Sequence, residues 1–333
     1  MSENKPKVLL ITSEWPSEEK PNSVPFLIQH ARFLKEEGLQ LSVFYFRGRK
    51  NPFNYLRAWF DVRCSEAWKK ADILHAHWGQ SGLLTLFSRK KRIVTFHGSD
   101  LHGILNSKGK QTFQGRLLIA ISRFLANRVD RVVVVSSELK MHLLNYKRSV
   151  DVIPMGVDPK LFKPMDKMEC RMQLGINLSS KIVLFLSDPD RIEKRFWLAE
   201  KIVESLKERN PNWDITLLPV FQVAHELVPV YINASDVLLL TSRYEGAPTV
   251  IKETIACQVP IVSVDVGDVR SRISMIDGCS VCSDQNIQCL IDGLEKAIHL
   301  NGKTNPPSLL LSELDERNNV RRLIDVYNEL LSE

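Results

Sequence analysis

The stretch Val237-Leu-Leu-Leu-Thr-Ser-Arg-Tyr-Glu-Gly-Ala-Pro-Thr-Val-Ile-Lys-Glu253 predicts a strand that leads into a helix through a short turn. Its apolar opening, Val237–Thr241, is typical of a strand buried on both faces. Gly246 lies in the turn, and Pro248 suits the first position of a helix, where the N–H that proline lacks has no helical partner. The remaining N–H groups at such a helix start attract anions, so the turn predicts a phosphate-binding site.

Charged side chains gather around this helix start. Glu245 and Glu253 are carboxylates, which do not bind phosphate, so we expect them to bind either hydroxyl groups or cations, and the hydroxyl groups of a sugar or a ribose fit. Arg191, Lys194 and Arg195 follow an earlier apolar run, where cations could neutralise a diphosphate. The alternatives are an acidic helix start that is stabilised by the helix dipole and a solvated basic turn.

The same alternation of strand and helix runs along the whole chain. The predicted strands are Lys7–Thr12, Leu41–Phe46, Ile73–His77, Arg92–Phe96, Arg131–Ser136, Val150–Pro154, Lys181–Ser187, Asp214–Leu218, Val237–Thr241 and Ile261–Val264. The predicted helices are Val24–Glu37, Arg195–Arg209, Val228–Ala234, Thr249–Cys257, Ile287–His299 and Ser312–Ser332, the last with Ser312 as its N-cap. This order favours parallel sheets built from βαβ units.

An irregular stretch, Met155–Pro164, interrupts the alternation and predicts a linker. We therefore expect two tandem, Rossmann-like, doubly wound α/β domains, residues 1–157 and 158–311. Ligands of open parallel sheets bind at the carboxyl ends of the strands. Two such domains that face a cleft would place the site there.

Length and charge agree with two domains. The chain has 333 residues, which suits about two domains. Residues 1–158 carry 25 Lys and Arg against 14 Asp and Glu, whereas residues 159–333 carry 20 against 25. The basic half is expected to face an anionic partner.

No apolar run approaches the ~20 residues that cross a bilayer, and no signal peptide opens the sequence. Six cysteines without an export signal predict reduced thiols and a cytoplasmic protein.

Histidines follow two of the predicted strands. His75 and His77 end one strand and share one face of the sheet, because side chains alternate with period two. They could line a binding site, hold a metal or simply be packed. His97 follows the next strand, ahead of Ser99 and Asp100, where it could donate a hydrogen bond or act as an acid or base.

Other motifs fail or stay open. Asn301–Thr304 resembles the end of a phosphate loop but lacks the required glycine, and no Gly-x-Gly-x-x-Gly is present. Cys279 and Cys282 have redox or zinc spacing without a second half, which favours a structural role. The segment Phe46–Phe60 mixes cations with aromatic rings, which suits either an anionic membrane surface or a solvated loop and core helix. The basic residues form no nucleic-acid reading module.

Together these residues resemble the GT-B fold glycosyltransferases of the retaining family 4, over nearly the whole length of the chain. The matching segments, in chain order, are Asp72–His77, Thr95–Gly98, Val152–Pro164, the pair Glu245 and Glu253, and Ala256–Ser263. The chain departs from the family pattern at three places. Pro21–Pro25 stands where the family has two glycines, and Pro248 stands where glycine is more common. Arg191 lies about two positions away from the place of the family's arginine.

The resemblance implies a role for each matching residue. Glu253 would bind the ribose of a nucleotide sugar, Glu245 the donor sugar, and Lys194 with Arg191 the diphosphate. The implied catalytic residues are Glu245, His97 and Lys194; the implied donor-binding residues are Arg191, Lys194, Val223, Glu245, Gly246, Ala247, Thr249, Val250 and Glu253; those on the acceptor side are His77, Ser99 and Asp100.

The resemblance also implies a reaction. A hexose or N-acetylhexosamine would pass with retained configuration from a nucleotide sugar, UDP-linked by family frequency, to a saccharide or lipid-linked acceptor in glycan synthesis. No metal and no cofactor would be needed. The helix 312–333 would cross back to the first domain. A same-fold epimerase or phosphorylase and a non-catalytic nucleotide-sugar binding protein stay open as alternatives.

Overall fold

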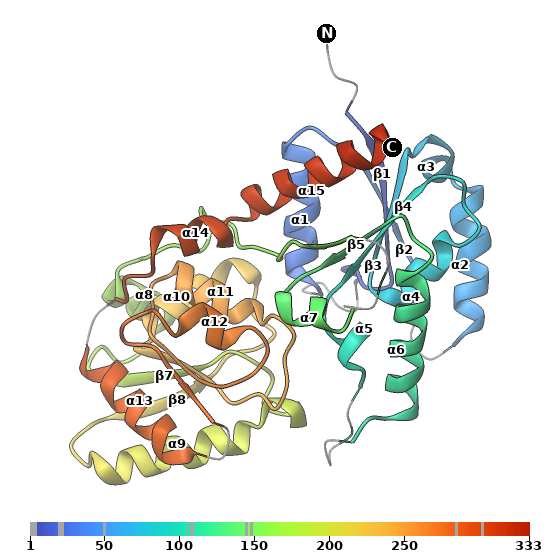
Figure 1. The fold of residues 1–333 in the computed structure, drawn as a ribbon. Coiled ribbons are helices and arrows are strands. Elements are labelled where there is room, and N and C mark those ends of the chain that lie inside the picture. Colours follow the sequence, from blue (N-terminus) through green and yellow to red (C-terminus); the bar gives the residue numbers. More distant parts are fainter. Residues whose placement is uncertain are drawn as a thin grey trace. The chain divides into compact units, whose positions relative to one another are not determined.

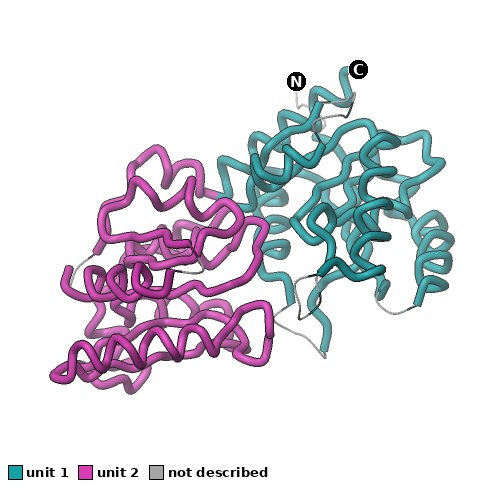
Figure 2. The backbone as a smooth tube through the Cα atoms, turned by 60° about the horizontal axis from the view of Figure 1, so that its bottom comes forward, with its two compact units in different colours: residues 1–155, 316–333 teal, residues 156–315 magenta. Residues whose placement is uncertain are grey.

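Figure 1 shows the computed structural model of the protein, which describes residues 5–18, 23–48, 51–104, 106, 110–143, 146, 149–283, 286–300 and 303–333. The chain divides into two compact units (Figure 2). Unit 1 comprises residues 1–155 and 316–333, and unit 2 comprises residues 156–315. Three features of the sequence analysis fall partly outside the described residues: Pro21 and Asn22, Arg49 and Lys50, and Asn301 and Gly302.

Unit 1 is built on a parallel sheet with the strand order β2-β1-β3-β4-β5-β6. Its described strands are β1 (Lys7–Thr12), β2 (Gln40–Tyr45), β3 (Ile73–His77), β4 (Lys91–Phe96), β5 (Arg131–Val134) and β6 (Val150–Val152). Its described helices are α1 (Pro25–Glu36), α2 (Phe53–Cys64), α3 (Glu66–Lys70), α4 (Gly79–Gly82), α5 (Ser99–His102), α6 (Phe113–Ala126), α7 (Ser137–Met141) and α15 (Glu316–Ser332), with the 3-10 turn η1 (Leu83–Thr85).

Alternating side chains of this sheet build a core on each face. Val8 and Ile73 belong to the core formed with α1 and α15. Leu9 and Leu74 belong to the core formed with α2 and with Leu84 of η1. The sheet is therefore buried between two helical layers, as the continuous apolar runs of its strands predict.

Unit 2 repeats this architecture with the strand order β11-β10-β9-β7-β8. Its described strands are β7 (Lys181–Phe185), β8 (Ile215–Pro219), β9 (Val237–Leu240), β10 (Ile261–Val264) and β11 (Ser280–Cys282). Its described helices are α8 (Lys167–Leu174), α9 (Phe196–Arg209), α10 (Val228–Ala234), α11 (Thr249–Ala256), α12 (Val269–Ile273), α13 (Ile287–His299) and α14 (Ser308–Leu314), with the 3-10 turns η2 (Ile192–Lys194) and η3 (His225–Leu227).

The strand orders fix where a ligand can bind. In each sheet the first strand in sequence has the second strand on one side and the third on the other. The connections therefore change direction between β1 and β3 in unit 1 and between β7 and β9 in unit 2. Open sheets bind ligands beyond the carboxyl ends of such a strand pair. The two fold predictions, parallel sheets and doubly wound domains, are confirmed.

The last helical stretch is two helices, so the prediction of one helix over Ser312–Ser332 is wrong. Ser312 lies inside α14 and is not an N-cap, because the preceding leucines extend the helical pattern toward the N-terminus. Asp315 is extended, with φ −65° and ψ 117°. Beside it the N–H of Val157 donates to the carbonyl of Leu314 at 2.8 Å, a long-range bond that interrupts the helix.

The cysteine prediction also needs correction. Cys282 and Cys289 form a disulfide between β11 and α13, whereas Cys279, which has the suggestive spacing, is a free thiol. The expectation of reduced thiols is therefore wrong for this pair, and the inference of a cytoplasmic compartment loses that support. Separately, no helix in the described part of the chain is long and apolar enough to cross a membrane.

Candidate functional site

In unit 2 the loops that follow β7 and β9 meet at the point where the strand order changes direction. Lys194 ends the turn η2 after β7, and its Nζ donates to Oε1 of Glu245, in the loop after β9, at 2.5 Å. Both side chains are about 15% exposed. A half-buried ion pair at this point places a cation and a carboxylate where a ligand of the sheet would lie.

Arg195 fastens these two loops together. It has a left-handed backbone, with φ 54° and ψ 51°, and it is 6% exposed. Its guanidinium donates to the carbonyls of Thr241 at 2.5 Å and Ser242 at 3.2 Å. In return the Thr241 hydroxyl donates to the carbonyl of Lys194 at 2.8 Å. Arg195 is thus a structural support for Lys194, a role that its place in a run of cations does not reveal.

Arg191 takes a different position. Its guanidinium contacts Oε1 of Glu193 at 2.5 Å, and its side chain is 55% exposed. The structure therefore brings Lys194 to Glu245 and leaves Arg191 on its sequence neighbour.

The helix α11 begins at Thr249, with Pro248 as the residue before it. The sequence predicted Pro248 as the first residue of this helix. In the structure Pro248 is instead the N-cap, one position earlier. The N–H of Ile251 returns to the carbonyl of Pro248. Thr249 and Val250 supply the N–H groups that open the helix, and Ala247 precedes them in the half-buried turn. The helix therefore presents its start to the same sheet edge as Lys194.

Glu253 lies further along α11 and is 7% exposed. Burial raises its pKa to about 7, and the positive charge of Lys252 acts in the opposite direction. A carboxyl group with such a pKa is present in both protonation states near neutral pH. As a carboxylate, Glu253 could accept hydrogen bonds from hydroxyl groups, and as a carboxylic acid it could donate one to them.

Gly267, which the sequence analysis missed, allows the turn to pack closely. Its φ is +53°, and a Cβ there would lie 2.5 Å from the carbonyl oxygen of Gly246. Only glycine fits both conditions, so the close approach fixes the turn that carries Glu245. Val223 follows β8, the neighbour of β7, and packs against the core of unit 2.

In unit 1 a group of histidines occupies the corresponding sheet edge. His77 ends β3, and its Nδ1 lies 2.9 Å from Nε2 of His97, which follows β4. His77 is fully buried, and burial, with the charges of neighbouring histidines, holds its pKa well below the usual value. Its Nε2 has no hydrogen-bond partner among the described residues. His97 also packs beside the rings of Trp78 and Phe26.

Asp100 ties the loops of this edge together. It is fully buried and accepts the N–H of His97 at 3.0 Å as well as a backbone hydrogen bond from Gly79, while burial raises its pKa to about 7. Ser99 lies beside it, with its hydroxyl 3.5 Å from Oδ1. Asp100 therefore positions His97, and it faces backbone groups.

His75 is anchored inside the unit. Its Nδ1 lies 2.6 Å from the hydroxyl of Tyr327 and its Nε2 2.7 Å from that of Thr95. On α1, Nδ1 of His30 lies 2.5 Å from Oε1 of Glu316. The prediction that His75 and His77 share a face is confirmed by their rings, 4.6 Å apart. His75 is thus a packed core histidine that holds α15 against the sheet.

One group among the described residues could hold a metal ion, and none of its three members is a predicted site residue. His102, Glu138 and His142 bring one ligand atom each within 4.8 Å of one another. His102 ends α5, and the other two lie on or directly after α7, four residues apart. These three residues were not predicted as a site from the sequence, because they come from separate elements.

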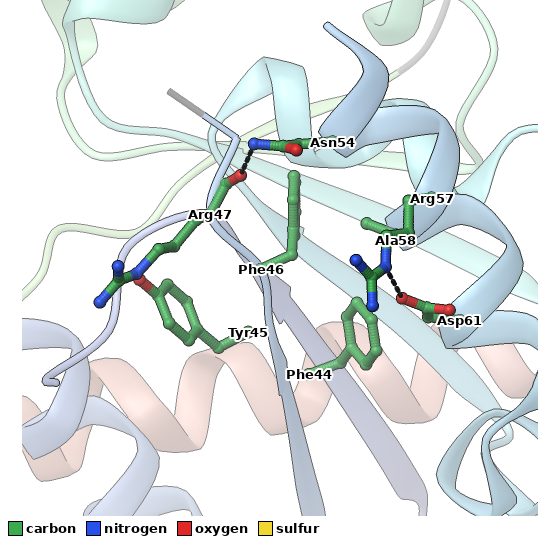
Figure 3. A pocket seen from close by; sticks show the side chains of 8 residues that line it. All are labelled: Phe44, Tyr45, Phe46, Arg47, Asn54, Arg57, Ala58 and Asp61. Atoms are coloured by element: carbon green, nitrogen blue, oxygen red, sulfur yellow. Dashed lines mark hydrogen bonds and ion pairs between the residues drawn. The ribbon is translucent and has the colours of Figure 1, made fainter. Parts of the chain in front are cut away.

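A pocket of about 330 Å³ opens at the carboxyl end of β2 (Figure 3). Its lining residues are Phe44, Tyr45, Phe46, Arg47, Asn54, Arg57, Ala58 and Asp61. Asn54 donates to the carbonyl of Arg47 at 2.9 Å, and Arg57 pairs with Asp61 at 3.5 Å. Ring faces beside guanidinium groups suit a sugar or a phosphate. The sequence marks Phe46–Phe60 as aromatic and basic but predicts no pocket there.

Comparison with known proteins decides the family. A family model described as Glycosyltransferase Family 4 matches residues 3–161, and one described as Glycosyl transferases group 1 matches residues 199–308. The chain belongs to the group 1, family 4 glycosyltransferases. Glu245 and Glu253 of this glycosyltransferase lie in the second matched stretch and His77 and His97 in the first, whereas Arg191 and Lys194 fall between them.

Three proteins illustrate the likeness. The putative teichuronic acid biosynthesis glycosyltransferase TuaC of Bacillus subtilis is 25% identical over 226 residues, 60% of this chain and 54% of TuaC. A sucrose-phosphate synthase structure from Thermosynechococcus elongatus has a TM-score of 0.77 at 16% identity and covers 99% of this chain and 100% of that one. Anabaena Alr3699/HepE, solved in complex with UDP, has a TM-score of 0.61 at 14% identity, with 97% and 100% covered.

These likenesses establish the two-domain α/β GT-B fold for this family 4 glycosyltransferase. The chain spans about half the length of the first curated relatives that it matches.

Proposed function

We propose that this chain is a retaining glycosyltransferase that moves a hexose or an N-acetylhexosamine from a UDP-sugar to a saccharide or lipid-linked acceptor. The observation that carries the proposal is the contact of Lys194 with Glu245 at the β7–β9 edge, beside the start of α11. A cation, a carboxylate and a helix start are the groups that a nucleotide sugar requires. The complex of HepE with UDP supports the choice of base.

Each donor group has a proposed partner in unit 2. Lys194 and the N–H groups of Thr249 and Val250 would bind the diphosphate, with Arg191 near the same loop. Glu253 would bind the ribose, Glu245 the sugar, and the backbone around Val223 the base. When the donor arrives, Lys194 would exchange its contact with Glu245 for phosphate oxygens, which frees that carboxylate for sugar hydroxyls.

In the proposed step the bond between the anomeric carbon and the diphosphate oxygen breaks. The acceptor oxygen bonds to the same face of the anomeric carbon, so the configuration is retained. The acceptor's proton passes to a donor phosphate oxygen, and the nucleoside diphosphate leaves. Lys194 and the dipole of α11 would stabilise the charge on the leaving group, which is the work that a metal ion performs elsewhere. His97 would line the sugar pocket.

Unit 1 is the proposed acceptor side, through His77, Ser99 and Asp100. The pocket beside Phe44 and Arg57 supports this assignment, because aromatic and guanidinium groups suit a saccharide or its phosphate. The likeness to TuaC supports an acceptor in cell-surface polysaccharide synthesis. We propose that the protein works in the cytoplasm at the inner face of the cell membrane.

A thermal-shift screen against UDP-, GDP- and ADP-sugars tests the donor, because a ligand of the folded state raises the unfolding temperature. We expect the shift with a UDP-sugar. We expect it to shrink in Lys194→Ala and Glu245→Gln. The matched control is Arg270→Ala, which removes an exposed ion pair of unit 2 with Asp265, 2.8 Å long, and should leave the shift unchanged.

Turnover separates the alternatives. Release of UDP that depends on an acceptor, with a product of retained configuration by NMR, supports the proposal. Conversion of the sugar nucleotide without an acceptor would indicate an epimerase. Donor binding without turnover on any acceptor would indicate a binding protein, and no shift with any sugar nucleotide would contradict the donor assignment itself.

A further inference from the structure

The helix α6 (Phe113–Ala126) is apolar on two opposite faces. Its inner face includes Gly115, Leu125 and Ala126, all buried, and the methyl groups of Leu125 lie over Gly82 of α4. Its outer face carries Phe113, Leu117 and Phe124, with exposed fractions of 81%, 52% and 45%. Residues four and seven apart lie above one another on a helix, so these three form one stripe.

The charges in the segment that contains this helix are of one sign. From Leu101 to Val129 the charged side chains are all cationic: Lys108, Lys110, Arg116, Arg123 and Arg128, of which Lys108 lies outside the described residues. Arg116, Arg123 and Arg128 are exposed. The guanidinium of Arg128 lies 4.9 Å from the centre of the Phe124 ring, at one end of the stripe. No ion pair within the described residues involves these three arginines.

The other aromatic and basic segment of the unit differs in this respect. On α2, Phe53, Leu56 and Phe60 are exposed, but Arg57 pairs with Asp61 at 3.5 Å. Arg63 donates to the Leu84 carbonyl at 2.9 Å and lies 3.6 Å from the centre of the Trp59 ring. Its cations are therefore engaged within the protein.

Both helices nevertheless cover the same face of the sheet. Leu84 of η1 shares a core with α2, and Gly82, just before it, contacts Leu125 of α6. Figure 1 shows α2 and α6 on the same side of this sheet, away from α1 and α15. The stripe of α6 and that of α2 can therefore act in one surface.

An exposed apolar stripe on a helix whose own charged residues are all cationic fits one class of partner. A second protein chain would require acidic groups aligned with the arginines, and a second copy of this helix would place cations against cations. The interface of an anionic bilayer supplies both an apolar layer and a continuous negative charge. We propose that α6 docks this protein on an anionic membrane surface, with Phe113, Leu117 and Phe124 in the acyl boundary and Arg116 and Arg123 at the headgroups.

This proposal rests on the proposed function only in its purpose, which is to bring the transferase to a lipid-linked acceptor. Docking itself needs neither donor nor acceptor. It can therefore be measured on the protein alone.

The experiment is flotation of the full chain with phosphatidylcholine vesicles and with vesicles that contain phosphatidylglycerol. We expect binding to the anionic vesicles only, with a steep loss as salt rises. Phe113→Ser with Leu117→Ser, and separately Arg116→Gln with Arg123→Gln, should each weaken that binding at least tenfold. The matched controls are Met275→Ser, 86% exposed in unit 2, and Arg270→Gln, which should bind like the parent protein.

The possible outcomes are distinct. No binding by the parent protein, equal binding to both vesicles, or equal loss in the controls would overturn the proposal. The proposal would also be overturned if light scattering showed dimers of the parent protein without vesicles and monomers of the Phe113→Ser, Leu117→Ser variant. Far-UV circular dichroism shows whether the variants fold. Loss of docking with an unchanged donor shift would support the proposal, and docking without any transferase activity would remove the proposed function but not the docking.

Discussion

Glu253→Gln should stabilise unit 2 at alkaline pH while it weakens donor binding. Glu253 is 7% exposed, and burial raises its pKa from 4.5 to about 7, with Lys252 opposing the shift. Below pH 4.5 the carboxyl is protonated in the folded and in the unfolded chain, so its burial has no ionic cost. As pH rises from 4.5 to 7, the unfolded chain loses this proton first, and the folded state loses stability.

The size of the effect follows from the shift. One pKa unit corresponds to about 1.4 kcal/mol, so the cost approaches ~3 kcal/mol above pH 7. At pH 5.5 the same relation gives about 1.4 kcal/mol. A neutral glutamine of the same shape removes the cost at every pH. The advantage of Glu253→Gln over the parent should therefore grow by roughly 2 kcal/mol between pH 5.5 and pH 8.5.

Urea titrations at these two pH values, followed by circular dichroism and fitted for two units, measure this growth. Glu200→Gln on α9, where the side chain is exposed, is the matched control and should show no pH-dependent gain. A difference between Glu253→Gln and the parent that stays constant with pH would refute the reasoning. If the variant gains stability but keeps full affinity for the donor, Glu253 is a buried acid and not the ribose ligand.

Three further predictions concern other parts of the molecule. Lys194→Ala should weaken donor binding about tenfold or more, because a charge-assisted contact to phosphate is lost; calorimetric titration measures this, and an unchanged affinity would exclude Lys194 from the diphosphate. Tyr327→Phe should destabilise unit 1 by about 1–3 kcal/mol in urea, because it leaves the buried Nδ1 of His75 without its partner at 2.6 Å; a loss below ~0.5 kcal/mol would contradict this. Reduction of the disulfide Cys282–Cys289, whose residues are seven apart, should destabilise unit 2 by about 2 kcal/mol; Cys282→Ser is the control that dithiothreitol should not affect.

Most strands were predictable because both sheets are buried on both faces. β3, β10 and α13 have the predicted bounds, since apolar runs or helical spacing end there at turns. α6 was not predicted, although the apolar and polar sides of its sequence differ as much as those of α9 and α11, which were predicted. Phe113, Leu117 and Phe124 are exposed on this helix, and the apolar pattern alone does not reveal that placement.

The candidate site divides in the same way. Lys194 and Glu245 were predictable, because residues after parallel strands meet at one sheet edge. His30 and Tyr327 were not, because the first pairs with Glu316, 286 residues away, and the second with His75, 252 residues away. No local spacing records such contacts. The sequence shows Arg195 only as one of several neighbouring cations. Its left-handed backbone and the buried guanidinium that contacts two carbonyl groups are seen only in the fold.

Arg195 and Asp100 show that a charged residue inside a motif can serve the loops and not the ligand. In unit 2 the Arg195 guanidinium donates to carbonyls of the neighbouring loop. In unit 1 the Asp100 carboxyl accepts backbone N–H groups from two loops. Both are buried, so removing either leaves backbone groups unsatisfied at the edge where a ligand would bind. Loss of activity on substitution at these positions is therefore no evidence of substrate contact. Two measurements separate these roles. Substitution of a positioning residue should lower the stability of its own unit along with turnover. Substitution of Lys194, whose half-buried side chain pairs only with Glu245 in the described contacts, should lower donor affinity and leave stability nearly unchanged.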